Sequence, residues 1–219
     1  MLELLRDVVE LPSYTYDKAG VDAVTSRFIQ EFEAMGLDVE RLPQETYGDH
    51  VVARTPAWER HAKGMLLVGH MDTVFPRESG FLHWTREGDV ARGPGVIDMK
   101  GGLVVALYAV KALSHLGLLH DLPISFFFNS DEEIGSPSSR EPLKREGERA
   151  RVALVFECGG LKHEIVTGRK GKYSFRMETH GQAGHAGVSG PKADKPSAII
   201  ELARQTLALE ALNDAAAGT

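Results

Sequence analysis

Two polar side chains follow an apolar run in the segment from Met65 to Pro76, MLLVGHMDTVFP. His70 and Asp72 are separated by one residue, and alternate side chains of an extended chain point to the same side. One of the two can therefore bind a metal ion while the other accepts the remaining imidazole N–H and fixes the orientation of the ring. A His, a spacer and an Asp occur together often by chance, so the rest of the chain decides what this pair does.

Acidic residues occupy three further motifs downstream. Asp98 lies in GPGVIDMKGG, Glu132 and Glu133 lie in NSDEEIGS, and Glu157 lies in FECGG. The carboxyl ends of parallel strands meet at one edge of an α/β sheet, so we expect these acids to meet the first pair there. Clustered carboxylates repel one another unless cations neutralise them, and imidazole with carboxylates suits Zn, Mn or Co. The alternative for any single acid is a solvated loop residue.

The apolar pattern predicts the elements that position these residues. Three apolar runs, at Met65–Val68, Ile124–Asn129 and Val152–Phe156, predict strands that end in polar residues, and the first two are apolar on both faces, which predicts a layer on each side of them. Helices are predicted at 2–11, 17–35, 103–116 and around 138–147, shorter strands at 37–42 and 51–54, and a hairpin near 81–91. This alternation predicts an α/β fold with a mixed, mostly parallel sheet flanked by helices.

The sequence changes character near residue 168. Lys172–Thr179 alternates polar and apolar side chains, which predicts a strand with one face in water, and Pro196–Leu212 predicts an amphipathic helix. Together they indicate the start of a second, α+β domain of ferredoxin-like type, which is too small to close a core by itself. We therefore predict a catalytic metal-binding domain at 1–167 and a partial second domain at 168–219.

Composition and charge narrow the functional classes. The net charge is -6 and basic residues are scattered among acidic ones, so no nucleic-acid partner is predicted. No apolar run reaches the roughly 18 residues of a membrane helix, and no signal-peptide pattern is present, so no membrane partner is predicted. The single cysteine, Cys158, permits no internal disulfide and is expected to be a small packed hydrophobe. These features predict a cytoplasmic protein.

The motifs GHMDTVFP, GPGVIDMKGG, NSDEEIGS and FECGG, in this order and at these intervals, resemble those of the M20 family of zinc peptidases and deacylases. The glutamate carboxypeptidase branch is the most similar, and the resemblance covers the chain from about residue 65 onward. It implies a hydrolase that uses two zinc ions, with Co or Mn as alternatives, to cleave an amide bond next to a carboxylate. The implied substrate is an N-acyl amino acid or a short peptide, and the implied assembly is a homodimer formed through the second, lid domain.

The resemblance also implies a division of the metal ligands. Asp98 would bridge two metal ions, His70 and Glu157 would complete one site, and Glu133 would bind the other. Adjacent residues of an extended segment point apart, so Glu132 and Glu133 cannot play the same role.

Three other residues receive catalytic roles from the resemblance. Glu132 would be the general base, and Asp72 would orient His70. His185 matches a histidine that, in dimeric members, reaches the active site of the neighbouring subunit and stabilises the developing oxyanion. The alternative for His185 is an ordinary polar residue of a Gly-rich loop.

The sequence departs from the family pattern after the first lid strand and helix. The remaining lid elements and a late His ligand have no counterpart in the sequence, which leaves Asp98, Glu133 and water for the second metal. Catalytic zinc sites normally have three protein ligands. We therefore expect a C-terminally truncated member of the family, and the alternative to a hydrolase is a non-catalytic metal-binding or interaction fragment.

Overall fold

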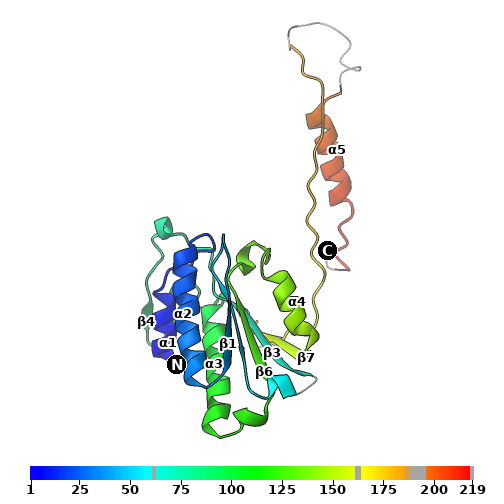
Figure 1. Ribbon diagram of the computed structural model, residues 1–219. Helices are drawn as coiled ribbons and strands as arrows, with labels where there is room; N and C mark the ends of the chain where they lie inside the picture. Colours follow the sequence, from blue (N-terminus) through cyan, green and yellow to red (C-terminus); the bar gives the residue numbers. More distant parts are fainter. Residues whose placement is uncertain (61–62, 161–163, 186, 188–195, 218–219) are drawn as a thin grey trace. The chain divides into compact units, whose positions relative to one another are not determined.

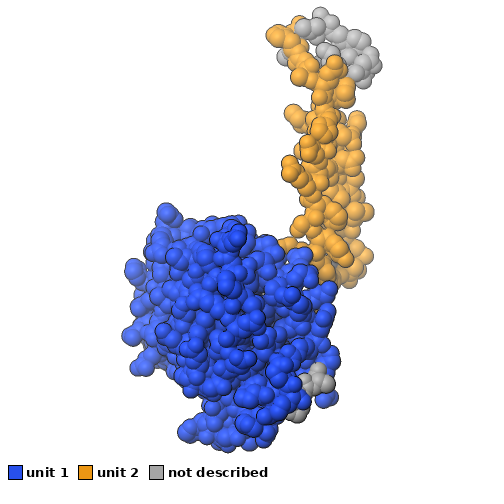
Figure 2. Space-filling model, viewed as in Figure 1, with its two compact units in different colours: residues 1–165 blue, residues 166–219 orange. Residues whose placement is uncertain are grey.

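The computed structural model describes residues 1–60, 63–160, 164–185, 187 and 196–217. The chain divides into two compact units, residues 1–165 and 166–219, which Figure 2 colours separately. No helix within the described ranges is both long and apolar enough to cross a membrane.

The first unit is built on a five-stranded sheet with the order β1-β2-β6-β3-β7. Its strands are β1 (Asp38–Leu42), β2 (His50–Arg54), β3 (Gly64–His70), β6 (Ile124–Asn129) and β7 (Ala150–Val155). β3 runs parallel to β6 and β7, whereas β2 is antiparallel to β1 and β6. The carboxyl ends of the three parallel strands therefore lie side by side, as predicted for an α/β sheet of mixed type.

Helices cover both faces of this sheet (Figure 1). The helices α1 (Leu2–Val9), α2 (Lys18–Ala34) and α3 (Lys100–His115) pack on one face, and α4 (Arg140–Glu148) packs on the other. Strand β6 is buried at every position, with Phe126 and Phe128 in the larger core and Phe127 in the smaller one. This alternation between two cores is the physical reason why the β6 segment is apolar on both faces.

Short elements complete the first unit. A two-stranded hairpin joins β4 (Thr85–Glu87) and β5 (Val90–Arg92), within the range predicted for it. Single 3-10 turns lie at η1 (Trp58–Arg60), η2 (Arg77–Ser79), η3 (Leu119–Asp121) and η4 (Glu132–Ile134). The last of these carries two of the candidate site residues.

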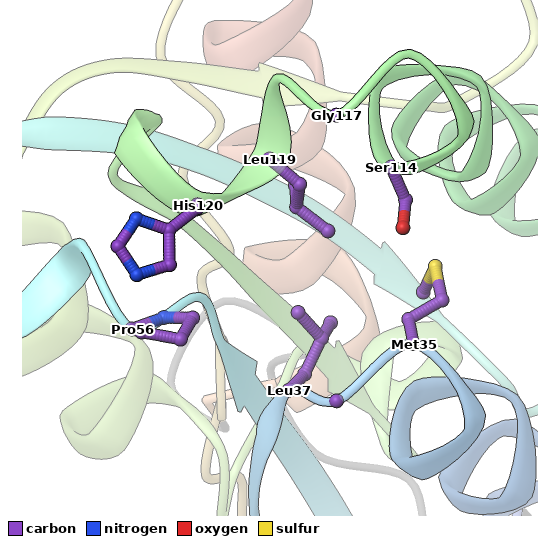
Figure 3. Close-up of a pocket in the computed structure, with 8 residues that line it drawn as sticks. Met35, Leu37, Pro56, Ser114, Gly117, Leu119 and His120 are labelled. Carbon is purple, nitrogen blue, oxygen red and sulfur yellow. The ribbon is translucent and has the colours of Figure 1, made fainter.

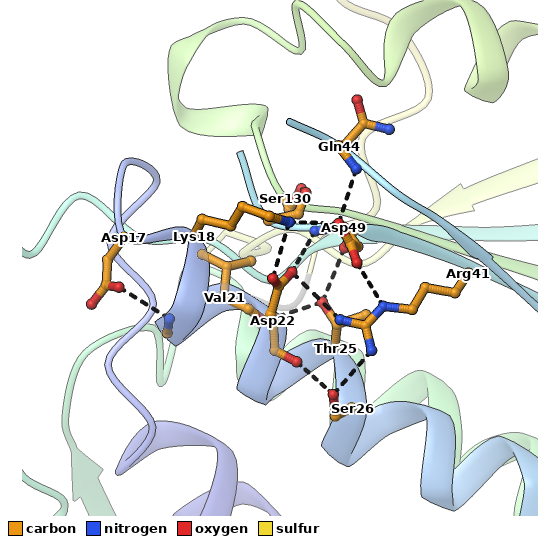
Figure 4. A network of polar contacts seen from close by, with 12 residues as sticks. Asp17, Lys18, Val21, Asp22, Thr25, Ser26, Arg41, Gln44, Asp49 and Ser130 are labelled. Carbon is orange, nitrogen blue, oxygen red and sulfur yellow. Dashed lines mark hydrogen bonds and ion pairs between the residues drawn. The ribbon is translucent and has the colours of Figure 1, made fainter. Parts of the chain in front are cut away.

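A charged network holds the loop before β2 (Figure 4). Asp49 accepts hydrogen bonds from Lys18 Nζ at 2.6 Å and Arg41 Nε at 2.7 Å, and from the backbone N–H of Gln44 at 2.9 Å. Burial alone would raise the pKa of Asp49, but these donors outweigh it and hold the pKa at about 2. The backbone N–H of Asp49 also donates to Asp22, so the network ties α2 to the residue that precedes β2.

The predicted strand Val152–Phe156 forms β7, and this apolar run is largely exposed, with Val155 59% exposed. The reason is that β7 is an edge strand, whose one partner among the described strands is β3. Cys158, just beyond β7, is exposed, so the prediction that it is a packed side chain is wrong.

The second unit contains one described helix, α5 (Ala198–Glu210), which confirms the helix predicted at Pro196–Leu212. Its cap is Ser197, whose side chain accepts the backbone N–H of Ile200. The strand predicted at Lys172–Thr179 is wrong, because the described residues there have no strand assignment. A strand needs hydrogen-bonded neighbours, and the described part of this unit supplies no partner strand, which leaves Phe175 85% exposed.

Candidate metal centre

His70 is the last residue of β3, and its ring is nearly fully buried. Its Nδ1 lies 3.0 Å from the backbone carbonyl oxygen of Asp72 and 3.3 Å from the Asp72 Oδ1 atom. Both oxygens can only accept, so Nδ1 carries a proton, and Nε2 faces the carboxylates of Asp98 and Glu157. This is the arrangement expected of a metal-binding imidazole whose ring is fixed by a neighbouring carboxylate.

Asp72 organises more than the histidine. Its fully buried carboxylate accepts the Thr15 hydroxyl at 2.7 Å, the backbone N–H of Glu132 at 3.2 Å and that of Glu133 at 3.3 Å. One carboxylate therefore fixes the imidazole and the start of η4. Thr15 belongs to this arrangement, although nothing in the sequence pattern around it indicates a role.

Close packing around α3 brings Asp98 to His70. Asp98 precedes α3, and its Oδ1 lies 3.0 Å from His70 Nε2. A Cβ atom at Gly69 would be 2.3 Å from the side chain of Leu103, and one at Gly102 would be 1.9 Å from the carbonyl oxygen of Phe156. Only glycine at these two positions lets α3 approach β3 and the end of β7 so closely. The GG of the DMKGG motif thus has a packing role beside Glu157.

Lys100, the first residue of α3, places a buried amine at the start of that helix. Lys100 is fully buried, and its Nζ donates to the backbone carbonyl oxygens of Val8 at 2.8 Å and Leu11 at 2.9 Å. Burial lowers the pKa of Lys100 to about 7. These contacts tie the end of α1 to the first turn of α3, next to Asp98.

The three glutamates complete the cluster. Glu132 Oε2 lies 3.9 Å and Glu157 Oε1 lies 3.5 Å from His70 Nε2. Two groups have ligand atoms within 4.8 Å of one another: His70 with Glu132 and Glu157, and His70 with Asp98 and Glu133. The structure therefore brings together the six residues that the sequence analysis places at one sheet edge.

The electrostatics of the cluster fit a bound cation. Burial and the neighbouring carboxylates raise the pKa of Glu132, and the same causes raise the pKa of Glu133 to about 7. Burial opposes a charge on His70, but the carboxylates of Asp72 and Glu157 outweigh it and raise the pKa of His70 to about 11. These shifts all favour added positive charge among the carboxylates, which a divalent metal would supply. Imidazole and carboxylate donors without a thiolate suit Zn, Mn or Co.

His185, which the sequence analysis places near the reaction, belongs to the second unit. Its Nδ1 accepts the backbone N–H of Gly187 at 3.0 Å, and its assignment as an oxyanion-stabilising residue stays a prediction.

A shallow pocket of about 310 Å³ lies elsewhere in the first unit (Figure 3). It opens beside the junction of α2 with β1 and the turn after α3, and it includes Pro56 just beyond β2. It is lined by Met35, Gly36, Leu37, Pro56, Ser114, Gly117, Leu119 and His120. This set contains a single histidine and no carboxylate, so it does not offer the ligands of the metal cluster described above.

Comparison with known proteins agrees with these observations. The model of peptidase family M20/M25/M40 matches residues 66–215. The chain is 32% identical over 195 residues to carboxypeptidase G2 from Pseudomonas sp. (strain RS-16), which covers 86% of this chain and 46% of that protein.

Two solved structures show the same fold. One is an M20 family metallo-carboxypeptidase, Sso-CP2 from Sulfolobus solfataricus, with a TM-score of 0.61 and 21% identity over 72% of this chain and 37% of that one. The other is human carnosine dipeptidase 1, with a TM-score of 0.59 and 18% identity over 70% of this chain and 37% of that one. The chain therefore spans less than half the length of these relatives.

Proposed function

Because this chain belongs to peptidase family M20/M25/M40, we propose that it forms the metal-binding part of a hydrolase that cleaves an amide bond next to a carboxylate. The observation that carries the proposal is the convergence on His70 Nε2 of Asp98 at 3.0 Å and Glu157 at 3.5 Å, with Glu132 and Glu133 alongside. We infer a substrate of the N-acyl amino acid or short-peptide class, in keeping with the carboxypeptidase and dipeptidase names of the relatives.

We propose two zinc ions as the resident metals, with cobalt or manganese able to replace them. His70 and Glu157 would hold one ion, Glu133 would hold the other, and Asp98 would bridge them. Divalent cations held in this way would supply Lewis-acid chemistry, polarising the scissile carbonyl and lowering the pKa of the attacking water.

Residues of this chain would transfer the proton and hold the metal-binding side chains in position. Glu132 would take the proton of the attacking water and deliver it to the leaving nitrogen as the C–N bond breaks. Burial and the neighbouring carboxylates raise the pKa of Glu132, which is the direction that makes a carboxylate a better proton acceptor. Asp72 would hold the imidazole of His70 and the η4 turn in place. Its carboxylate contacts the Thr15 hydroxyl, His70 Nδ1 and the backbone N–H groups that begin η4.

The second unit would also contribute to the reaction. His185 would stabilise the oxyanion that develops on the scissile carbonyl, contributed by one subunit of a homodimer to the site of the other. The homodimer would form through residues 166–219. We place the protein in the cytoplasm, in keeping with its single cysteine, Cys158.

Metal analysis and an activity assay on the same preparation test the proposal. The chain is dialysed against zinc, its bound metal is counted, and acyl-glutamate and acetyl-amino-acid substrates are offered. Bound zinc with release of free amino acid supports the hydrolase. Bound zinc without hydrolysis favours the alternative, a non-catalytic metal-binding fragment of such a protein. A chain that binds no divalent metal contradicts both.

A further inference from the structure

Asp131 is a fully buried carboxylate that precedes the two glutamates of η4 and is not part of the metal cluster. It accepts the backbone N–H and the hydroxyl of Ser138 at 2.6 and 2.8 Å, and those of Ser139 at 3.2 and 2.6 Å. Asn129 Nδ2 donates a fifth hydrogen bond at 3.3 Å. Asp131 therefore fastens the turn to the start of α4 through contacts to two consecutive serines.

His50 closes the same loop from another strand. It begins β2 and is fully buried, with Nδ1 at 2.8 Å from the Ser130 hydroxyl and Nε2 at 3.1 Å from the Ser138 hydroxyl. Ser130 precedes η4 and Ser138 follows it. A single imidazole thus joins the two ends of the loop that carries Glu132 and Glu133.

The contacts of His50 extend away from the metal cluster. The Ser130 hydroxyl donates to the backbone carbonyl of Gly48 and accepts from His50 Nδ1, and the neighbour of His50 is Asp49, the centre of the charged network in Figure 4. Lys18 and Arg41 hold Asp49 at 2.6 and 2.7 Å. His50 therefore lies between this network and the η4 loop, and its hydrogen bonds go to Ser130 and Ser138, neither of which is a candidate ligand.

We propose that His50 and Asp131 are positioning residues that close the 130–138 loop and thereby hold Glu132 and Glu133 in the metal cluster. Asp72 holds the same two residues from the side of His70 through their backbone N–H groups. The inference rests on the proposed function, because it concerns the residues assigned there as base and ligand. It adds that β2, which is antiparallel to β6, controls the placement of Glu132 and Glu133 through His50.

Four variants of the full chain test the inference. His50→Leu removes both imidazole contacts, and His50→Gln keeps one donor and one acceptor. In Asp131→Asn the remaining oxygen can face the backbone N–H groups of Ser138 and Ser139 only if the new N–H₂ group takes the place of Oδ1, where it meets the Asn129 Nδ2 donor. The control is Glu146→Gln, which neutralises another buried carboxylate, held by Arg54 at 2.8 Å and Ser125 at 2.6 Å, at the opposite ends of β2 and β6.

The measurement is equilibrium dialysis against cobalt, with the absorption spectrum of the bound ion and the melting temperature of each variant. We expect His50→Leu and Asp131→Asn to weaken cobalt binding by about 10- to 100-fold and to change the spectrum. His50→Gln recovers most of the affinity. Glu146→Gln lowers the melting temperature but leaves the affinity and the spectrum unchanged.

Several results would overturn the inference. One is a folded His50→Leu variant with wild-type affinity and spectrum, and another is an equal loss of affinity in Glu146→Gln. If His50→Leu and Asp131→Asn do not fold, Ser138→Ala decides by the same criteria, because it removes one contact to each of the two residues. A wild-type chain that binds no cobalt and no zinc instead refutes the proposed function, and the inference falls with it.

Discussion

Asp72→Asn is the substitution with the sharpest predicted effect on the metal centre. Asp72 Oδ1 faces His70 Nδ1 and the backbone N–H of Glu132, and Oδ2 faces the Thr15 hydroxyl and the backbone N–H of Glu133. An asparagine amide has one oxygen and one N–H₂ group. In either orientation its N–H₂ meets a backbone N–H donor, so one η4 contact is lost.

The expected loss follows from this geometry. A buried donor without an acceptor costs about 1–3 kcal/mol of folding stability. Displacement of the imidazole and of η4 is expected to weaken metal binding by about 10- to 100-fold, which corresponds to about 1.4–2.7 kcal/mol.

Isothermal titration with zinc at neutral pH, together with urea unfolding, measures both quantities. Thr15→Val is the matched control, because it removes one hydroxyl donor and leaves the other three contacts of Asp72. We expect it to cost about 1 kcal/mol of stability and to leave zinc affinity close to wild type. Wild-type zinc affinity in Asp72→Asn would refute the view that this carboxylate organises the centre.

Three further predictions concern the base, the packing of α3 and the charged network. Glu132→Gln should lower turnover by about 100- to 10,000-fold with metal content unchanged, because a general base is lost and no proposed ligand is removed; loss of metal in parallel would make Glu132 a ligand instead. Gly102→Ala should destabilise the first unit by about 1–3 kcal/mol in urea unfolding, because the new Cβ atom would lie 1.9 Å from the Phe156 carbonyl oxygen. Gly147→Ala in α4, where a Cβ atom meets open space, is its control and should be neutral or stabilising, and equal effects of the two would contradict the packing argument. The pKa of Asp49 is about 2 in the folded chain against an ordinary 3.8, so its ionisation contributes about 2 kcal/mol of stability that is present above pH 4 and lost as the pH falls towards 2. Asp49→Asn should therefore reduce the fall in unfolding free energy between pH 6 and pH 2.5, and an unchanged pH dependence would refute that contribution.

The parts of the centre that could be predicted from the sequence are those that lie at strand ends. His70 follows an apolar run, and Glu132 and Glu133 follow another, so the parallel pairing of β3 with β6 places them together. His70 pairs with Asn129 because the apolar runs of β3 and β6 begin and end at matching points.

Other parts depend on contacts that have no local pattern. His50 joins the loop around η4 only because β2 pairs antiparallel with β6, and Thr15 reaches Asp72 through a loop that lies beside Thr73. The exposure of Val155 could not be predicted either, because an apolar run does not tell an edge strand from a central one. The alternation of polar and apolar residues at Lys172–Thr179 predicts a strand that the structure lacks. Pairing partners, and not periodicity, decide whether a strand forms.

Anomalous scattering at the zinc edge, from crystals of the chain grown with zinc, tests the central claim most directly. The account predicts two peaks at the carboxyl edge of the sheet, both beside Asp98, one next to His70 and Glu157 and the other next to Glu133. Zinc peaks elsewhere on the molecule, with none at this edge, would contradict it.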